Sequence, residues 1–386
     1  MPPPRNFAEM PEINLHSISF WIVVVFALVA IVQMVVYLAV YGKVSFYKEP
    51  IKNSVSHPPV SIVICAKNEA DNLTEYLPKI LTQDYPEFEV VVVNDCSWDN
   101  TEDVLREYSK IFPNLKTIVI KEDEYYKHGK KFALMVGIKG TKYEHLLFTD
   151  GDCVPASANW IKEMIEGYTA GKEIVIGYGP YKKEKSFLNK LIRFDTFMIG
   201  MHYLSAGVAN KAYMGVGRNL SYKKDLFFKN KGFAKHYHIT SGDDDLFVNE
   251  TATATNTSVI LHKDSFTYSN PATSFTEWNR QKARHLTTGN MYTSSSKNRL
   301  MMLHGLNYLF WIMAIASFTR IDWIIVTASF FLLKNIIQFI TLYKGAEKLD
   351  ERDIAGGFLL FEFLLLFLYP AWHLNRSLFK TAKWKK

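Results

Sequence analysis

Asp150 and Asp152 stand one glycine apart, directly after the short apolar run 145–149. A run of this kind predicts a buried strand, so both carboxylates are expected on the turn at its carboxyl end. Hard divalent cations prefer carboxylate oxygens, and the pair therefore predicts a site for Mg²⁺ or Mn²⁺. An Asp-x-Asp triplet also occurs in ordinary solvated turns, so the rest of the chain has to support this prediction.

Two further residues are suited to a phosphorylated ligand. Asp95 comes just after the apolar run 88–93, where an acidic residue can accept hydrogen bonds from a nucleobase or a ribose. Its alternative role is that of a turn former or helix cap. Lys130 opens the next helical segment and is placed to balance phosphate charge, although lysines at helix starts are usually only solvated.

Acidic and basic groups with catalytic potential follow in the second half of the chain. Three consecutive acids, Asp243 to Asp245, open a helix, and one carboxylate is enough to stabilise a helix N-terminus. Three acids are more than the helix N-terminus needs, so the sequence predicts that one of them is a general base. Gln281 and Arg284 are three residues apart and share a helix face, on which an arginine can clamp a diphosphate. Flanking a membrane segment is the alternative role of Arg284.

The elements that must position these residues alternate between strands and helices. Strands are expected at 60–65, 88–93, 116–120 and 145–149, with helices at 71–81, 101–110, 130–139 and 160–169. Further strands are expected at 174–178, 212–220 and 257–262, with helices at 187–204, after 241 and at 275–288. The alternation predicts an α/β domain with a mostly parallel central sheet. Ligands bind outside the carboxyl ends of such strands.

Both ends of the chain are apolar enough to enter a membrane. Of the 386 residues, 48% are hydrophobic, and these concentrate at 18–41 and after residue 300. The first run can cross the ~30 Å hydrocarbon core as a helix and has no cleavage signal, so we expect a retained anchor. Further apolar segments follow at 300–318, 323–343 and 354–374, and the charged Lys334 and Glu362 inside them are expected to avoid lipid.

These patterns predict a division of the chain. Its parts are an N-terminal segment (1–17), a transmembrane helix (18–41), a linker (42–58), a cytosolic catalytic domain (59–299), a C-terminal transmembrane region (300–374) and a basic tail (375–386). The net charge of +7 arises from basic residues beside the apolar segments, so the expected partner is a lipid bilayer and not a nucleic acid. The cysteines Cys65, Cys96 and Cys153 lack metal-site spacing and suit a reducing cytosol.

The order of the motifs resembles that of a known enzyme family. Along the chain stand Ala66-Lys67-Asn68-Glu69, Asn94-Asp95-x-Ser97-x-Asp99-x-Thr101, Gly129-Lys130-x-x-Ala133-Leu134, Thr149-Asp150-Gly151-Asp152, Gly242-Asp243-Asp244, Pro271-x-Thr273 and Gln281-x-x-Arg284. In this order they resemble the family-2 inverting glycosyltransferases with a GT-A fold. The resemblance is closest to the membrane-embedded branch of cellulose, chitin-oligosaccharide and hyaluronan synthases, and it extends over residues 59–285.

The resemblance implies transfer of a sugar from a nucleotide sugar, expected to be UDP-linked, to a lipid-linked or saccharide acceptor. It implies a bacterial inner membrane with the catalytic domain in the cytoplasm. Asp244 would be the base, with Asp243 as the alternative one residue away, and Asp95 would contact the uracil ring. The implied nucleotide-sugar-binding residues are Ala66, Asn68, Glu69, Asp95, Lys130, Asp150, Gly151, Asp152, Gln281 and Arg284.

Two departures from the family pattern leave alternatives open. His285 stands where the family has the tryptophan of Gln-x-x-Arg-Trp, which puts processivity in doubt, and Asp243 stands where the family usually has glutamate. The alternatives are a processive polysaccharide synthase and a non-catalytic nucleotide-sugar-binding scaffold. Four spans would place the basic tail outside, against the positive-inside tendency, whereas a flat segment 300–318 would return it inside.

Overall fold

The central sheet is built from strands that are buried on both faces. The structure, a computed structural model, describes residues 17–49, 57–121, 129–169, 171–239 and 241–375. The sheet has the order β3-β2-β1-β4-β7-β6-β8. Every residue of β1 is buried, as expected for a central parallel strand with helices on both sides. The strands are β1 (Val60–Ala66), β2 (Phe88–Asp95), β3 (Leu115–Ile120), β4 (His145–Asp150), β6 (Ile174–Ile176), β7 (Leu220–Lys223) and β8 (Thr257–Val259).

The predicted mostly parallel sheet is confirmed. Strands β1 to β4 pair in parallel, β7 pairs antiparallel with both β4 and β6, and β6 pairs in parallel with β8. A separate two-stranded ribbon joins β5 (Cys153–Pro155) to β9 (Thr267–Ser269). The carboxyl ends of β1, β2 and β4, in the parallel half, carry the expected site residues Asn68, Glu69, Asp95, Asp150 and Asp152.

Helices cover both faces of the sheet. One face packs against α3 (Ala70–Leu81), α4 (Thr101–Ile111) and α6 (Trp160–Ile165). The buried residues of α3 recur at helical spacing: Leu73, Tyr76, Leu77, Ile80 and Leu81. The opposite face packs against α5 (Lys130–Gly140), where a Cβ on Gly137 would come within 2.9 Å of Val63 and Val93 side chains. This glycine therefore brings α5 into close contact with β1 and β2.

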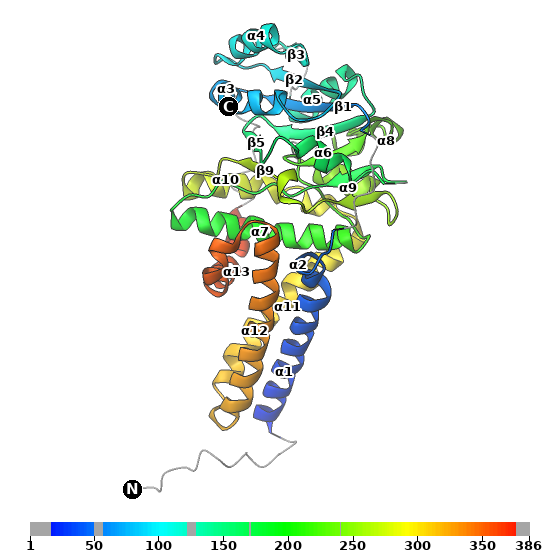
Figure 1. Cartoon of the computed structure of the whole chain (residues 1–386). Coiled ribbons are helices and arrows are strands. Elements are labelled where there is room, and N and C mark those ends of the chain that lie inside the picture. Colours follow the sequence, from blue (N-terminus) through cyan, green and yellow to red (C-terminus); the bar gives the residue numbers. More distant parts are fainter. Residues whose placement is uncertain (1–16, 50–56, 122–128, 170, 240, 376–386) are drawn as a thin grey trace, which may run out of the picture.

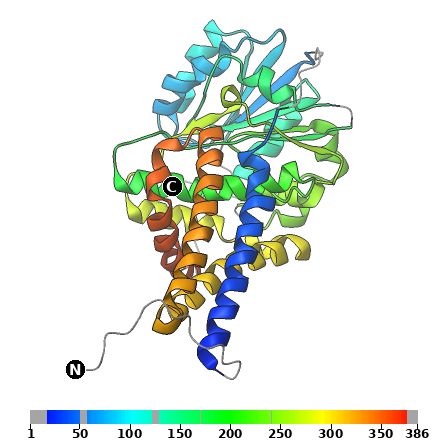
Figure 2. The same ribbon diagram turned by 60° about the horizontal axis from the view of Figure 1, so that its bottom comes forward.

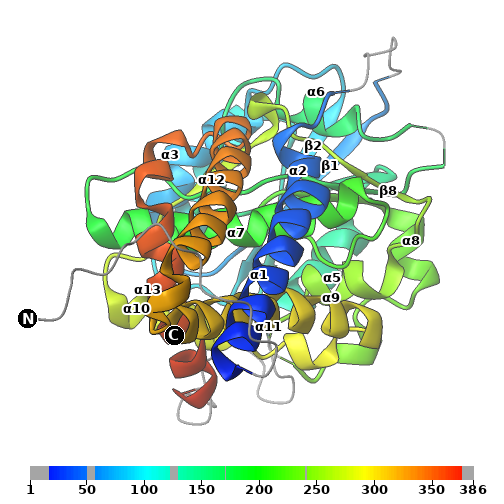
Figure 3. The ribbon, with the colours of Figure 1, turned by 90° about the horizontal axis from the view of Figure 1, so that it is seen from below.

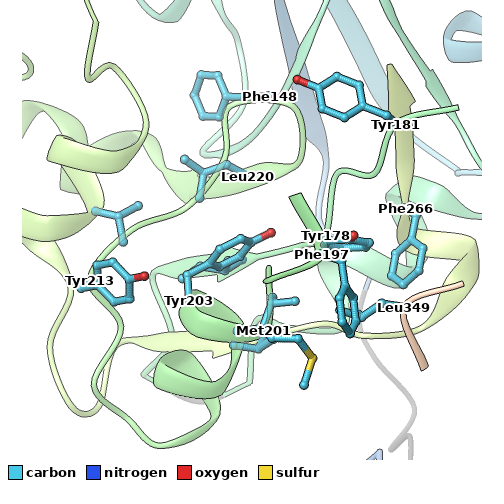
Figure 4. Packing of buried hydrophobic residues seen from close by; sticks show 14 of the residues in the cluster. Phe148, Tyr178, Tyr181, Phe197, Met201, Tyr203, Tyr213, Leu220, Phe266 and Leu349 are labelled. Atoms are coloured by element: carbon cyan, nitrogen blue, oxygen red, sulfur yellow. The ribbon is translucent and has the colours of Figure 1, made fainter. Parts of the chain in front are cut away.

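The long helix α7 (Phe187–Val208) runs across the underside of the domain (Figure 1). The hydrophobic core that packs around this helix is rich in aromatic side chains. Figure 4 shows two of them, Tyr178 and Phe266, whose ring centroids are 5.3 Å apart. The same cluster of buried hydrophobic residues extends from the sheet, through α7, to Leu349, which directly follows the helix formed by Ile324–Lys348. The shorter helices of this half are α8 (Lys224–Lys229), α9 (Asp245–Thr251) and α10 (Phe275–His285), with the 3₁₀ turns η2 (Ala234–His236), η3 (Lys263–Ser265) and η4 (Gly289–Met291).

Four described helical segments are long and apolar enough to cross a membrane. The first comprises α1 (Ile18–Val36), a π-helical turn η1 (Tyr37–Tyr41) and α2 (Gly42–Ser45). The others are built on α11 (Ser294–Phe318), η5 (Ile321–Trp323) with α12 (Ile324–Lys348), and η6 (Arg352–Gly357) with α13 (Phe358–Asn375). Figures 1 and 2 show α1, α11 and α12 extending together below the domain. The predicted N-terminal segment up to residue 16 and the basic tail from 376 lie outside the described residues.

Several predicted boundaries were wrong. The segment 212–220 is not a strand, because β7 begins only at Leu220 and the preceding residues form a loop. The amide of Asn219 holds this loop, donating to the carbonyl oxygens of Tyr178 at 2.9 Å and Ser265 at 2.7 Å. The helix predicted to Thr169 ends at Ile165, the strand predicted to His262 ends at Val259, and the helix predicted to 288 ends at His285.

Candidate active site

Hydrogen bonds connect the loop after β1 to the loop after β2. Asn68 and Cys96 have φ angles of 55° and 54°, in the left-handed region, which asparagine tolerates better than most residues. The backbone N–H of Asn68 donates to Ser97 Oγ at 2.9 Å, and the backbone N–H of Trp98 donates to Asn68 Oδ1 at 3.0 Å. Asn68 therefore links the two loops at the edge of the sheet.

Glu69 connects these loops to the aspartate pair. Its backbone N–H donates to Thr101 Oγ1 at 2.9 Å, and its carboxylate accepts a hydrogen bond from Asn72 Nδ2 at 2.6 Å. A Cβ on Gly151 would lie 3.2 Å from Glu69 Cγ. The glycine between Asp150 and Asp152 thus lets the turn pass close to the glutamate.

Lys130 joins two acidic motifs that are far apart in the sequence. Its Nζ lies 2.8 Å from Asp150 Oδ1 and 3.2 Å from Asp243 Oδ2. Burial opposes the charge of Lys130, but Asp150, Asp243 and Asp244 together hold its pKa well above the ordinary value. Lys131, by contrast, donates to the carbonyl oxygens of His236 and Ile239. Lys127 and His128, which precede α5 in the sequence, lie outside the described residues.

The aspartate pair has the donor chemistry of a hard-cation site. Ligand atoms of Asp150, Asp152 and Cys153 all lie within 4.8 Å of one another. Burial and the two carboxylates raise the pKa of the Cys153 thiol well above its ordinary value, so the thiol stays protonated and is a poor ligand. Burial favours protonation of Asp150 too, but Lys130, Arg218 and Arg284 hold its pKa below the ordinary value. The ionised carboxylate of Asp150 and the neighbouring carboxyl oxygens of Asp152 therefore offer ligands suited to Mg²⁺ or Mn²⁺.

The three consecutive acids have separate surroundings. Asp243 pairs with Lys130, whereas Asp245 accepts hydrogen bonds from the hydroxyls of Thr288 and Tyr292, the latter at 2.7 Å. Asp244 caps α9 and accepts the backbone N–H groups of Gly217 at 2.6 Å and Asp245 at 2.7 Å. Burial, and then Asp243 and Asp245, raise the pKa of Asp244 to about 7. Asp244 therefore has the proton affinity of a general base.

The helix α10 presents Gln281 and Arg284 to the site. Ser274 caps this helix by accepting the backbone N–H of Glu277 at 3.2 Å. Gln281 Nε2 donates to the hydroxyl of Tyr181 at 2.9 Å, and Arg284 lowers the pKa of Asp150. Gln281 and Arg284 are thus on the cavity side of the helix, as their spacing predicted.

Arg218 is a site residue that sequence reasoning missed. Its guanidinium lies over the ring of Tyr181, 4.4 Å from the centroid, and donates from Nη1 to Ser269 Oγ at 2.7 Å. The residue was hidden in the segment 212–220, which was predicted to be a strand. Gly215 and Gly217 just before an arginine in an apolar stretch were the available sign that this segment is a loop.

A single cavity of about 490 Å³ brings most of these groups together. The expected site residues that line it are Glu69, Lys130, Asp150, Gly151, Asp152, Asp243, Asp244, Gln281 and Arg284, and Arg218 and His285 line it as well. Ala66, Asn68 and Asp95 lie at the ends of β1 and β2 and are not among the described residues that line it.

The same cavity extends between the apolar helices. Its far end is lined by residues of α1 and η1, of α11, of α12 and of α13, among them Gln33, Tyr37, Asn307, Gln338 and Glu362. Lys334 is fully buried and bonds to Gln338, which in turn donates to Glu362 at 2.5 Å. The prediction that Lys334 and Glu362 avoid lipid is thus supported, since both are buried within the helix bundle.

Part of the sequence matches known proteins. Residues 61–229 match the family described as Glycosyl transferase family 2. Glycosyltransferase AglE of Haloferax volcanii is 37% identical over 100 residues, which are 25% of this chain and 32% of that protein. A poly-beta-1,6-N-acetyl-D-glucosamine synthase of Staphylococcus epidermidis is 33% identical over 95 residues, which are 25% of this chain and 22% of that protein. The chain thus spans less than a third of the length of these two relatives.

The fold is similar to that of a solved structure. The mannosyltransferase PcManGT from Pyrobaculum calidifontis, in complex with GDP-Man and Mn2+, superposes with a TM-score of 0.55 at 17% sequence identity. The match covers 84% of this chain and 98% of that protein. At this level of identity the likeness concerns the fold, which is a GT-A fold.

Proposed function

We propose that this chain transfers a sugar from a nucleotide sugar to an acceptor at the membrane, with inversion of the anomeric carbon, because residues 61–229 match the family described as Glycosyl transferase family 2. The observation that carries the proposal is the shared cavity. Asp150, Asp244 and Arg284 line one end of it, and the apolar helices line the other. A water-soluble donor and a membrane-bound acceptor can meet in such a space.

Asp244 is the proposed base. Its pKa of about 7 lets the carboxylate take the proton of an acceptor hydroxyl near neutral pH. The hydroxyl oxygen then forms a bond to the anomeric carbon while the bond from that carbon to the diphosphate oxygen breaks on the opposite face. This single displacement inverts the anomeric configuration, and the nucleoside diphosphate leaves with the electron pair.

Charge on the leaving diphosphate is offset by cations at the sheet edge. Lys130, Arg218 and Arg284 all act on the charge of Asp150, so an anion bound beside this carboxylate faces three positive side chains. A divalent cation, Mg²⁺ or Mn²⁺, held by Asp150 and Asp152 supplies further positive charge beside the diphosphate. Asp95, together with Ala66 and Asn68, is proposed to contact the nucleoside from the loops after β1 and β2.

The acceptor is proposed to be lipid-linked or a saccharide. The far end of the cavity combines aromatic and polar side chains, including Tyr37, Gln33 and Asn307, within the apolar helices. We place the domain at residues 59–299 on the cytoplasmic side of a bacterial inner membrane, because nucleotide sugars are made in the cytosol. His285 stands where the family motif Gln-x-x-Arg-Trp has a tryptophan. The absence of this tryptophan favours addition of single sugars over polymer synthesis.

The test is a donor screen with the purified full-length protein. A panel of UDP-sugars and other nucleotide sugars is offered with membrane lipid extract as acceptor, and release of the nucleoside diphosphate is measured with and without Mn²⁺. We expect metal-dependent release with one class of donor and a product whose linkage is inverted relative to the donor. Saturable donor binding without turnover would instead indicate a non-catalytic binding protein, and long products from single encounters would indicate a processive synthase.

A further inference from the structure

Lys282 stands in the sequence between Gln281 and Arg284, yet its ammonium group is held by a partner on another helix. Its Nζ lies 2.7 Å from Asp195 Oδ2, and Asp195 belongs to α7. Only 5% of Lys282 and 2% of Asp195 are exposed. A buried pair of this kind costs desolvation, and such pairs are best known as devices that fix the register of packed elements.

The helix α13 completes the surroundings of this pair. The hydroxyl of Tyr369 donates to the second oxygen of Asp195, Oδ1, at 2.6 Å. The Nζ of Lys282 also lies 5.0 Å from the ring centroid of Tyr369 and 5.1 Å from that of Trp372. Asp195, Lys282 and Tyr369, here called the α10 anchor, therefore connect α7, α10 and α13 through one buried charge pair.

A second contact joins α10 to α13 beside the anchor. The rings of Trp278 and Trp372 meet edge to face with centroids 4.9 Å apart, and Trp278 is 1% exposed. The indole Nε1 of Trp372 donates to Asn279 Oδ1 at 2.6 Å. Three side chains of α10, from Trp278 to Lys282, are thus fixed to one neighbouring helix.

The anchor controls how α10 can rotate. Successive helical residues are ~100° apart, so Lys282 and Arg284 project in directions roughly 200° apart around the axis. A rotation of α10 that breaks the bond from Lys282 to Asp195 therefore also swings Arg284 away from its place in the cavity. A shift of about 1 Å at a charge-stabilising group can cost a large share of the rate.

We propose that Asp195 and Tyr369 are positioning residues for sugar transfer, acting through Lys282 to hold Arg284 against the leaving diphosphate. The proposal rests on the function proposed above for Arg284. It makes Lys282 a structural cation and not a phosphate ligand, in spite of its place in the Gln-x-x-Arg motif. It also makes the geometry of the active site dependent on α13.

The experiment is a double-mutant cycle between Tyr369→Phe and Arg284→Lys. Tyr369→Phe keeps the ring next to Lys282 and removes only the hydroxyl that orders Asp195. In the otherwise unchanged protein we expect it to lower kcat about tenfold with the donor KM changed less than about twofold. In the Arg284→Lys background, where the bidentate group is already lost, we expect Tyr369→Phe to lower kcat less than about twofold.

Tyr268→Phe is the matched control. Its hydroxyl also donates to a carboxylate, Asp350 Oδ2, at 3.0 Å, but Tyr268 neither lines the cavity nor contacts the α10 anchor. We expect wild-type kcat from this variant. Equal losses from Tyr369→Phe in both backgrounds, or an equal loss from Tyr268→Phe, would mean that the hydroxyl supports only general packing and would overturn the proposal.

A second measurement separates this proposal from the proposed function. The affinity for UDP with Mn²⁺ is measured for the same variants by calorimetry. If the wild type turns over no donor, the proposed function fails, while non-additive losses of UDP affinity would still support the anchor. If the wild type transfers sugar but the losses in kcat and in UDP affinity are both additive, the role proposed for the α10 anchor is wrong while the proposed function stands. Asp195→Asn, which keeps the size of the side chain, serves as a second variant and is expected to follow the same pattern.

Discussion

Asp243, Asp244 and Asp245 are neighbours in the chain but have different surroundings. All three line the cavity, but Asp243 pairs with Lys130, Asp245 accepts hydrogen bonds from Thr288 and Tyr292, and burial raises the pKa of Asp244 to about 7. The difference arises because each side chain leaves the backbone in a different direction and meets different partners. At the residue scale, this arrangement favours Asp244 over Asp243 as the base.

Asp244→Asn is expected to abolish transfer while donor binding is retained. The amide has almost the same size but cannot accept the acceptor proton, so we expect the rate to fall by about 10²–10⁴-fold. Rates and donor affinity are measured on the purified protein. Asp243→Asn is the matched comparison and is expected to weaken donor binding through Lys130. Full transfer by Asp244→Asn would exclude it as the base and make Asp243 the next candidate.

The pH dependence of transfer is expected to follow Asp244. The ionised form is active, and because its folded-state pKa is raised to about 7, activity is lost as the pH falls through this value. We expect kcat/KM to drop about tenfold per pH unit on the acidic side. Lys130, Arg218 and Arg284 hold the pKa of Asp150 below its ordinary value against the effect of burial, so Asp150 stays ionised over the same range. A rate that is flat between about pH 5 and pH 8 would contradict this assignment.

Metal removal is expected to stop transfer. A chelator should abolish the activity and excess Mn²⁺ or Mg²⁺ should restore it, because the diphosphate then regains its positive partner. Asp152→Asn should raise the metal concentration needed for half-maximal rate. Asp264→Asn is a suitable control, since this aspartate is 44% exposed and does not line the cavity. Unchanged metal dependence in Asp152→Asn would argue against the pair as ligands.

At the scale of elements, α7 is the platform that joins the domain to the apolar helices. Arg193 of α7 is fully buried and donates to Glu351 Oε2 at 2.9 Å and to Asp353 Oδ2 at 2.7 Å. Both acids lie in the connection between α12 and α13. This contact fixes the end of α12 to the underside of the sheet domain, and it was not visible in the hydrophobic pattern of either segment.

Arg193→Met is therefore expected to destabilise the protein strongly. It leaves Glu351, which is 1% exposed, without its cation, a change that typically costs about 3–5 kcal/mol. Lys183→Met is the control, because its pair with Asp350 at 2.9 Å joins side chains that are 43% and 35% exposed and should contribute at most about 1 kcal/mol. The measurement is the midpoint of thermal unfolding in detergent. Similar midpoints for both variants would count against a stabilising role for the buried pair.

At the scale of the whole molecule, α13 differs from the other apolar helices. Figures 1 and 3 show it lying directly beneath α7 and α10, whereas α1, α11 and α12 extend farther from the domain. Side chains of α1 and α11 pack together in a cluster that includes Phe26, Ala30 and Phe310. A flat segment 300–318, one of the two arrangements the sequence allowed, is therefore not favoured by the packing of α11.

We expect α1, α11 and α12 to cross the bilayer and α13 to lie along its surface. Three crossings return the chain to the side of the catalytic domain, which agrees with the positive-inside tendency of the basic tail. A reporter fused after Lys386 and active only in the cytoplasm tests this topology. The same reporter fused between η5 and the end of α11, at Thr319, should report the opposite side. A signal from Lys386 on the opposite side would support four crossings instead.

The sequence by itself determined the parallel strands, the apolar helices and the strand-end carboxylates Asp150 and Asp152. These follow from local periodicity and from polar residues that end apolar runs, so short segments are enough to predict them. Only the tertiary structure decided the separate surroundings of Asp243 to Asp245, the entry of Arg218 into the cavity, the pairing of Lys282 with Asp195 and the place of α13. Each depends on partners far away in the chain, and the hydrophobic pattern of a segment does not encode which distant side chain will meet it.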